Sequence, residues 1–485
     1  MKHLSHITLV SLIAMASHAP VAIAQGCKAN AAWFTATAPP GTSEPPADSE
    51  CAFYQRSWEM FIWLTAEDSA THQPRFIGFT TPDELFVKPK PPGPSPSDQP
   101  LTLLSKIAKT SRLTISAKDG AVKRLGMGLR LAKNPMEITA DRPEIDAGVI
   151  QAGSKGAVVD SNGRTLYFAQ HVDPVFEAYV KQHHFDQASN LAAAKPDDAF
   201  PPGSIELKSS WRVKQPNETG NGFIMVKATV PKLVKDHQND NDIIVSLTET
   251  RDEDMLLVGL HVVFVTVGHP EFVWATFEHK DNAPDLGGPG QGTGAATATG
   301  SPAPVDSTRS YTFYKQGTPA KECNIAGTLT GTGLGRLTLN EADQTLQPVS
   351  NIFREFRFGG EPTPEDEIID LNDDVHRLTP QGSPIASYIL IGALWMNEPT
   401  MKPFRAGLDF GDIGSELADR TRFAGETKLS NATMETFTQT ENNCFSCHDT
   451  KSKRVGANLQ PFPATLLGVS HILRDAYKAD PRPNP

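Results

Sequence analysis

The sequence lacks a long apolar segment beyond its first residues, and it is short of basic side chains. After residue 24, no stretch reaches the roughly 18 consecutive apolar residues that a membrane-spanning helix needs. Lysine and arginine number 45 against 56 aspartates and glutamates, which gives a formal net charge of −11 at pH 7. An acidic chain is a poor ligand for the phosphate backbone of nucleic acids. We therefore expect no transmembrane segment and no nucleic-acid partner.

The signatures of several enzyme classes are also absent. There is no G-x-S-x-G elbow, no Walker glycine loop and no G-x-G-x-x-G that opens a helix, so a serine hydrolase, a P-loop NTPase and a Rossmann dehydrogenase are not indicated. The acidic stretches 236–242 and 370–375 lack the glycine and the distal glutamate of an EF-hand loop. The function must be sought in other motifs.

The first 24 residues have the features of an export signal. One lysine precedes the apolar core ITLVSLIAMA, and Ala22-Ile23-Ala24 is a small-x-small cleavage site. We predict a signal peptide over 1–24 and a mature periplasmic protein that begins at Gln25. Acylation of Cys27 in a lipoprotein is the alternative, although Ala24 stands where a larger aliphatic residue is usual.

Alternation of apolar and polar residues predicts a β-rich body. In 205–213, Leu207 and Trp211 fall on one face and Glu206 and Lys208 on the other, which is typical of a half-buried strand. We expect an α+β, β-rich fold with an antiparallel, sandwich-like or open-barrel body. Further strands are expected at 222–230, 243–248, 256–266 and 272–279, with a hairpin over 156–172 around Asn162-Gly163.

Helices are expected to flank this body, and one pair of them surrounds the C-terminal motif described below. We divide the mature chain into the body, 25–428, and a C-terminal segment, 429–485, packed on it. Loops rich in proline or glycine interrupt the body at 35–50, 88–100 and 287–304, and the last should be a flexible surface excursion. The expected helices are 57–68, 173–184, 430–443 and 463–477.

Cys444, Cys447 and His448 form C-x-x-C-H, the attachment motif of a c-type haem. Two cysteines one helical turn apart can both reach the vinyl groups on one edge of the macrocycle, and the adjacent histidine can reach the iron. A zinc site would need a second pair of ligands at a suitable spacing, and the sequence has none. The motif predicts one covalent haem c with His448 as proximal ligand.

Three further cysteines, Cys27, Cys51 and Cys323, allow one disulfide in an oxidising compartment. Three pairings are possible. We favour Cys27–Cys51 because it closes the shortest loop, which would leave Cys323 either buried and free or exposed and available for chemistry.

The sixth iron ligand is less clear, because no methionine follows His448. His471, on the predicted C-terminal helix, is a possible distal ligand, and an open sixth position that binds small molecules carries equal weight. Met434 is more simply explained as a core residue beside Phe437.

Other polar groups give weaker signals. The stretch 274–284 gathers Glu278 and His279 at a strand end, where an acid–base role or a local turn would both fit. His261, inside an apolar strand, would ordinarily be a buried histidine with one partner. Lys451, Lys453 and Arg454 form a small basic cluster that could meet haem propionates or simply be solvated.

Several stretches together resemble a group of large exported bacterial proteins, the cytochrome c family proteins with a single C-terminal C-x-x-C-H. The resemblance implies haem at Cys444, Cys447 and His448, and it implies no substrate. The stretches are WEMFIWL (58–64), IELKSSWRV (205–213), VGLHVVF (258–264), FVWATFEHKDNAP (272–284) and LSNATMETFTQTENNCFSCH (429–448).

Three functions are compatible with these observations. The first is a periplasmic monohaem cytochrome-like protein with an electron-transfer or oxidoreductase role and a redox partner protein. The second is a haem enzyme with an open distal site, either peroxidase-like or oxidising a small molecule. The third is a ligand- or partner-binding protein with a structural or sensory haem.

Overall fold

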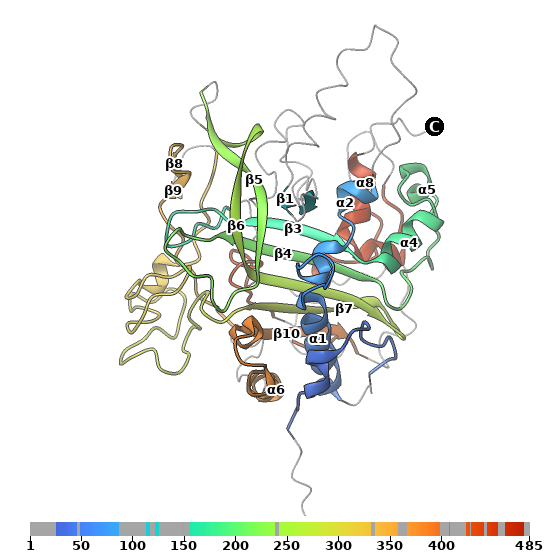
Figure 1. Ribbon diagram of the computed structural model, residues 1–485, viewed down its shortest axis with the longest axis horizontal. Coiled ribbons are helices and arrows are strands. Elements are labelled where there is room, and N and C mark those ends of the chain that lie inside the picture. Colours follow the sequence, from blue (N-terminus) through green and yellow to red (C-terminus); the bar gives the residue numbers. More distant parts are fainter. Residues whose placement is uncertain are drawn as a thin grey trace, which may run out of the picture.

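One large antiparallel sheet organises the part of the chain that the structure describes (Figure 1). It has nine strands and is not closed into a barrel, so the expected α+β, β-rich and antiparallel fold class is confirmed. The predicted signal peptide and the loop 88–100 lie outside the described residues. This computed structural model describes residues 26–45, 49–86, 113–116, 122–125, 149, 156–237, 242–330, 335–356, 366–397, 407, 423–426, 428–440, 444–453 and 461–479.

Strand β6 (Asp242–Thr266) is the centre of the sheet. Met255 pairs with both Val213 in β4 and Val226 in β5, so these strands lie on opposite edges of β6. Val262 pairs with β4 and β7, so β5 and β7 share the second edge. The other strands are β1 (Leu113–Ser116), β2 (Val122–Leu125), β3 (Tyr167–Val172), β4 (Ile205–Val213), β5 (Met225–Asp236), β7 (His269–His279), β10 (Tyr388–Met396) and β11 (Phe423–Gly425), with a separate pair β8 (Thr338–Asn340) and β9 (Thr345–Gln347).

Helix α1 (Glu50–Thr65) covers one face of the sheet (Figure 1). Trp58 and Phe61 pack on Phe277 of β7 with ring centroids 5.0 and 4.4 Å apart. The remaining helices are α2 (Pro82–Leu85), α4 (Pro174–Gln182), α5 (Ala188–Ala192), α6 (Asp366–Leu378) and α8 (His471–Ala479), with 3-10 turns at Ala31–Thr35, Arg75–Gly78, Ala320–Glu322, Pro384–Ser387, Cys444–Ser446 and Leu466–Val469.

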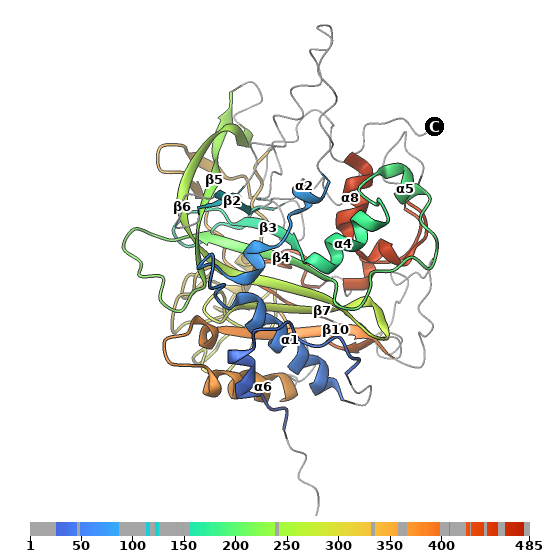
Figure 2. The same cartoon turned by 45° about the vertical axis from the view of Figure 1, so that its right-hand side comes forward.

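The C-terminal segment covers part of the opposite face. In Figure 2, α8 lies beside α4 and α5, at one end of the strands. Leu467, Ile472 and Leu473 share an apolar cluster with Val263 and Trp274 of the sheet. The strands between α1 and this segment are therefore buried on both sides, as in the middle layer of a three-layer packing.

The strand predictions need two corrections. The predicted half-buried strand 205–213 coincides with β4, but its polar side is covered as well. The C-terminal segment lies on that side, and its Thr433 bonds Ser210. The predicted strands 243–248 and 256–266 are one strand, β6, because β5 also pairs with the charged stretch between them, with a shift of register between Pro231 and Leu233. The turn at Asn162-Gly163 is confirmed: Gly163 has φ +81°, and Val159 bridges to Thr165.

Two of the predicted helices are wrong in part. The described residues of 430–443 form turns and no helix, because Asn431 and Thr433 direct their side chains to each other and to the sheet. In 463–477, a 3-10 turn ends before Ser470, which is extended, and α8 begins only at His471. The helices predicted at 57–68 and 173–184 are present, although α1 begins earlier, with Ser49 as its N-cap.

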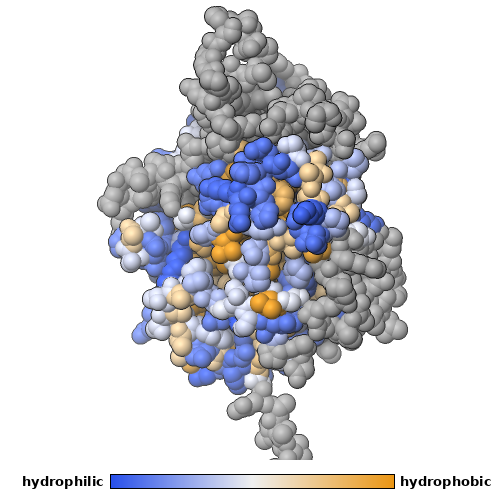
Figure 3. Space-filling view, turned by 90° about the vertical axis from the view of Figure 1, so that its right-hand side faces the viewer, coloured by the Kyte–Doolittle hydropathy of each residue, from blue (hydrophilic) through white to orange (hydrophobic). Residues whose placement is uncertain are grey.

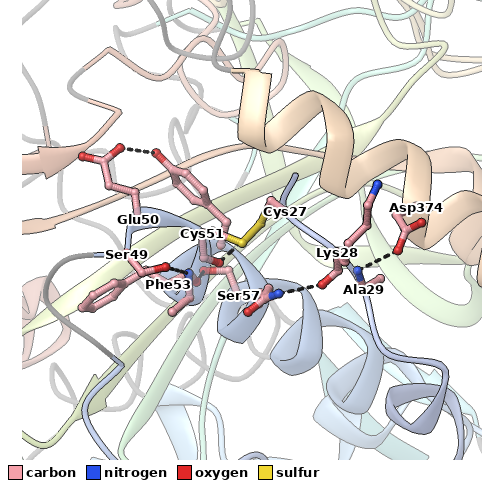
Figure 4. The surroundings of a disulfide bond; sticks show 12 residues. Cys27, Lys28, Ala29, Ser49, Glu50, Cys51, Phe53, Ser57 and Asp374 are labelled. Carbon is pink, nitrogen blue, oxygen red and sulfur yellow. Dashed lines mark hydrogen bonds between the residues drawn. A yellow bond between two sulfur atoms is a disulfide. The ribbon is translucent and has the colours of Figure 1, made fainter. Parts of the chain in front are cut away.

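A disulfide joins the N-terminal segment to α1 (Figure 4). Cys27 and Cys51 are bonded, with a Cα–Cα distance of 5.6 Å, which confirms the favoured pairing. The Cys27 sulfur is thus engaged in a disulfide, whereas lipid attachment would need the same sulfur for a thioether bond. The Ala29 N–H donates to Asp374 of α6 at 2.8 Å. Cys323 is free and buried, and burial raises the pKa of its thiol to about 12.

The loop 287–304 is irregular, but it does not lie wholly on the surface. Ala296 is buried with Val305, Tyr314 and Phe353 in a small separate cluster. None of the helices in the described ranges is long and apolar enough to cross a membrane. On the side that carries α4, α5 and α8, the coloured residues are a mixture of polar and apolar types (Figure 3).

Candidate haem-attachment site

The motif Cys444–His448 forms a single tight turn. The N–H groups of Cys447 and His448 both donate to the Cys444 carbonyl, at 3.2 and 2.9 Å. The 3-10 turn Cys444–Ser446 therefore places the two cysteines one turn apart, with the histidine directly after them. Neither cysteine is in a disulfide. This is the local geometry that two thioether bonds and a proximal histidine require.

A hydrogen bond fixes the imidazole of His448. Its Nδ1 lies 2.8 Å from the carbonyl oxygen of Val469. A carbonyl only accepts, so Nδ1 carries the hydrogen and the neutral ring keeps its lone pair on Nε2, the atom that binds iron in such sites. Trp274 of β7 packs against the ring, with centroids 4.2 Å apart. A carbonyl partner of this kind is a common means of orienting a metal-binding histidine.

The first of the two residues between the cysteines attaches the turn to the sheet. Phe445 is fully buried, stacks on Phe423 of β11 at 5.2 Å and meets Trp274 edge-on at 6.1 Å. The motif is thus packed directly on the body rather than carried on a separate small fold.

Helix α8 supports the turn from its other side. Arg474 donates to the Cys447 carbonyl at 3.1 Å and to the carbonyl and carboxylate of Asp449. Asp449 also pairs with Lys453 at 2.8 Å. Of the basic cluster noted in the sequence, Lys453 therefore has a local partner, while Arg454 lies outside the described residues.

His471, the predicted distal ligand, lies next to His448. The two rings are stacked, with centroids 3.8 Å apart and planes 16° apart, and His471 Nε2 is 3.0 Å from the Cys447 carbonyl. Two axial ligands would point their nitrogens at each other from opposite sides of the iron. Here the rings lie face to face, so the structure brings the two histidines together but not in that arrangement.

A cavity of about 80 Å³ lies beside His448, between the sheet and the segment 428–440. Its walls combine polar and apolar groups in similar proportion. Glu206 is buried and accepts a hydrogen bond from Ser470 Oγ at 2.7 Å. The lining residues are Gln170, Glu206, Lys208, His261, Val263, Trp274, Met434, Glu435, Thr438 and His448.

Sequence reasoning missed most of this cavity. The polar side of 205–213 was assigned to solvent, whereas Glu206 and Lys208 face the C-terminal segment. The signal that could have identified Glu206 and Lys208 is their polarity, because β4 lies next to the central strand β6, where both faces of the sheet are covered. His261 was noted as a buried strand histidine, and the structure places it in the cavity wall.

The segment 428–440 is fixed on the sheet by buried hydrogen bonds. Asn431 donates to Thr276 Oγ1 at 2.9 Å and to the Phe277 carbonyl at 3.0 Å. The hydroxyls of Ser210 and Thr433 are 2.7 Å apart. Met434 follows directly and is 2% exposed. These bonds set the position of the cavity wall opposite the strands.

The polar group at 274–284 has structural contacts. Glu278 is fully buried, accepts from Arg354 at 2.8 Å and from the Ala432 N–H at 3.1 Å. Burial lowers the pKa of His279 to about 4, and its ring stacks on Phe223 at 3.8 Å. Neither Glu278 nor His279 lines the cavity beside His448.

The donor set fits a covalently attached haem. Two cysteines that are in no disulfide lie one turn apart, and an adjacent imidazole is oriented through Nδ1. The described residues contain no group of three or more His, Cys, Asp or Glu side chains that could hold a metal ion. Haem iron does not need such a group, because the macrocycle supplies four of its ligands. The cavity is smaller than a macrocycle and marks only the space beside the imidazole.

Neither a protein-family model nor a curated protein nor a solved structure matches this chain. Its function has to be argued from its own residues.

Proposed function

We propose that this is a periplasmic monohaem c-type protein with an electron-transfer or oxidoreductase role, related to the cytochrome c family proteins that it resembles. Haem c would be attached at Cys444 and Cys447, with His448 as the proximal ligand. The observation that carries the proposal is the turn Cys444–His448, whose histidine is oriented by the Val469 carbonyl.

The chain's own residues would hold the group rigidly. The two thioether bonds would fix one edge of the macrocycle, Val469 would fix the imidazole, and Phe445 would keep the turn on the sheet. When bound, haem supplies one-electron redox chemistry and a metal at which small ligands can bind. The disulfide Cys27–Cys51 supports an oxidising compartment such as the periplasm, since disulfides are rare in reducing ones.

A second candidate is a haem enzyme with an open distal site. The observation that favours it is the presence of several polar side chains in the cavity beside His448, because the polarity of a haem pocket helps to decide between electron transfer and ligand chemistry. An electron carrier would not need Gln170, Glu206, Lys208 and His261 in one wall.

The test is expression in a periplasm that contains haem-attachment machinery. We expect a mass increase of one haem that survives denaturation, and its loss when Cys444→Ser and Cys447→Ser are combined. Cys323→Ala is the matched control, because Cys323 is also a free thiol but lies outside the motif. A folded wild-type protein without covalent haem would refute the proposal.

Visible spectra then separate the two candidates. Low-spin bands that carbon monoxide leaves unchanged would indicate a sixth ligand from the protein and an electron carrier. High-spin bands that shift with carbon monoxide would indicate an open iron.

A further inference from the structure

The imidazole of His448 is held at one edge and on both faces. Its Nδ1 donates to the Val469 carbonyl at 2.8 Å. His471 stacks on one face, with ring centroids 3.8 Å apart and planes 16° apart. A ring this close leaves no space for another on the same face, so Trp274, whose ring centroid is 4.2 Å from that of His448, lies against the other face. The imidazole is therefore enclosed between two flat side chains.

His471 is itself fixed by the turn that it supports. Its Nε2 lies 3.0 Å from the Cys447 carbonyl oxygen, and because a carbonyl only accepts, Nε2 carries the hydrogen of this bond. Arg474, three residues further along α8, donates to the same oxygen at 3.1 Å. The start of α8 thus contacts both the backbone of the motif and the ring of its histidine. A protonated Nε2 has no lone pair to offer to an iron.

The orientation of the His448 ring matters because the lone pair of its Nε2 lies in the plane of the ring. A metal ion is bound well only along the direction of that lone pair. The hydrogen bond to Val469 fixes the position of Nδ1, but a single bond leaves the plane of the ring free to turn about that atom. Flat contacts on both faces remove this freedom. Partners that orient a metal-binding histidine are typically worth about 10–100-fold in metal affinity.

We propose that His471 is a positioning residue for the proximal imidazole and not a ligand of the iron. It stacks on His448 to fix the plane of that ring, and its bond to the Cys447 carbonyl holds it there. The inference rests on the proposed haem protein and deepens it, because it moves His471 from the distal to the proximal side of the site. It also removes His471 from the groups that could fill the sixth position.

Three substitutions separate the flat ring of His471 from its nitrogen atoms. His471→Phe keeps a ring that can stack but has no atom that could bind iron or donate to Cys447. His471→Gln keeps a donor group but has no ring, and His471→Ala has neither. Stacking and ligation of the iron therefore give different patterns across the three variants.

The measurement is the proton NMR spectrum of the oxidised, haem-loaded protein. The shifts of the haem methyl groups depend on the orientation of the axial imidazole plane, because that plane determines how the unpaired electron of ferric iron is distributed over the macrocycle. We expect His471→Phe to keep the wild-type pattern. In His471→Ala and His471→Gln, the methyl signals should be displaced or doubled, because the imidazole plane then adopts other orientations.

The matched control is His183→Ala. His183 is an exposed histidine outside the motif, and its ring stacks on Phe185 with centroids 5.3 Å apart. Its removal should leave the haem methyl spectrum unchanged. His471→Leu fills the space of the imidazole without offering a flat face, so it should also displace the methyl signals, and it provides the test if His471→Ala does not fold.

A wild-type methyl pattern in His471→Ala, His471→Gln and His471→Leu would overturn the inference while leaving the haem protein intact. A change of spin state in His471→Phe, seen as new visible bands, would overturn it in favour of ligation by His471. Absence of covalent haem would instead refute the proposed function, and it is recognised beforehand by mass.

Discussion

Asp160 lies at the tight turn before β3, and its carboxylate is completely buried. One oxygen, Oδ1, accepts from the N–H groups of Asn162 and Arg164 at 2.9 and 2.8 Å. The other, Oδ2, has no hydrogen-bond partner among the described residues. Burial raises the pKa of this carboxyl from 3.8 to about 6, although the two backbone hydrogen bonds oppose the shift.

The direction of the pH effect follows from this shift. Because the pKa is higher in the folded state, folding favours the protonated carboxyl, and this contribution is complete below pH 3.8. It is lost as the pH rises to about 6, where the buried group becomes charged. A shift from 3.8 to about 6 corresponds to about 3 kcal/mol, at 1.36 kcal/mol per pKa unit.

The variant Asp160→Asn keeps an oxygen that can accept both backbone hydrogen bonds, but it carries no charge. We expect its free energy of unfolding to exceed that of wild type by up to about 3 kcal/mol at pH 7 and to differ little at pH 4. Urea unfolding at pH 4, 5, 6 and 7 measures this. Asp343→Asn, at an exposed turn where Asp343 accepts from the Thr345 N–H, is the control and should change stability by less than about 0.5 kcal/mol. The reasoning fails if Asp160→Asn has the same pH dependence as wild type.

The other predictions concern the buried ion pair and the disulfide. Burial opposes the charge of Arg354, but the carboxylates of Asp285 and Glu278 outweigh it and raise the pKa of the guanidinium. Arg354→Met leaves Glu278 buried without its cation and should lower the free energy of unfolding in urea by about 3–5 kcal/mol. Arg309→Met, at an exposed pair, should lower it by no more than about 1 kcal/mol. Similar losses of stability in the two variants would contradict this view of the buried pair. Combined Cys27→Ala and Cys51→Ala opens a loop with a separation of 24 residues and should cost about 3.5 kcal/mol. Wild type under reducing conditions should have the same stability as that variant. A urea unfolding midpoint of wild type that does not change on addition of reductant would contradict the prediction.

The strands were predictable where their pattern is local. Residues 205–213 alternate in polarity, and β4 has those bounds. Several elements had no prediction, and two of them, β10 and α6, pack directly on α1. Strand β10 is the apolar run Tyr388–Met396, a pattern that is typical of a strand buried on both faces. Helix α6 contains the acidic stretch 370–375, which the sequence analysis compared only with a calcium-binding loop. Asn372 in α6 bonds Trp58 and the backbone of β10, and these tertiary contacts are not visible in a local window.

The candidate site likewise has one part that is local in the sequence and one part that is formed only by tertiary contacts. The C-x-x-C-H turn could be found because its three motif residues lie within one turn of the chain. The cavity could not be found, because its walls come from β3, β4, β6, β7 and the segment 428–440, and only the folded sheet brings these together. The proximity of His471 to His448 was anticipated, but its stacked orientation depends on the bend at Ser470, for which the sequence gives no strong signal.

The connectivity of the C-terminal segment has a consequence for the order of events in the cell. Ser470 bonds Glu206 across 264 residues, and Thr433 bonds Ser210 across 223. Contacts so distant in sequence form late, because the intervening chain must be ordered first. Cys444 and Cys447 belong to the segment that these contacts hold on the sheet. With haem attached at these cysteines, as proposed above, the architecture would favour attachment to the undocked turn first and docking of the segment on the sheet afterwards.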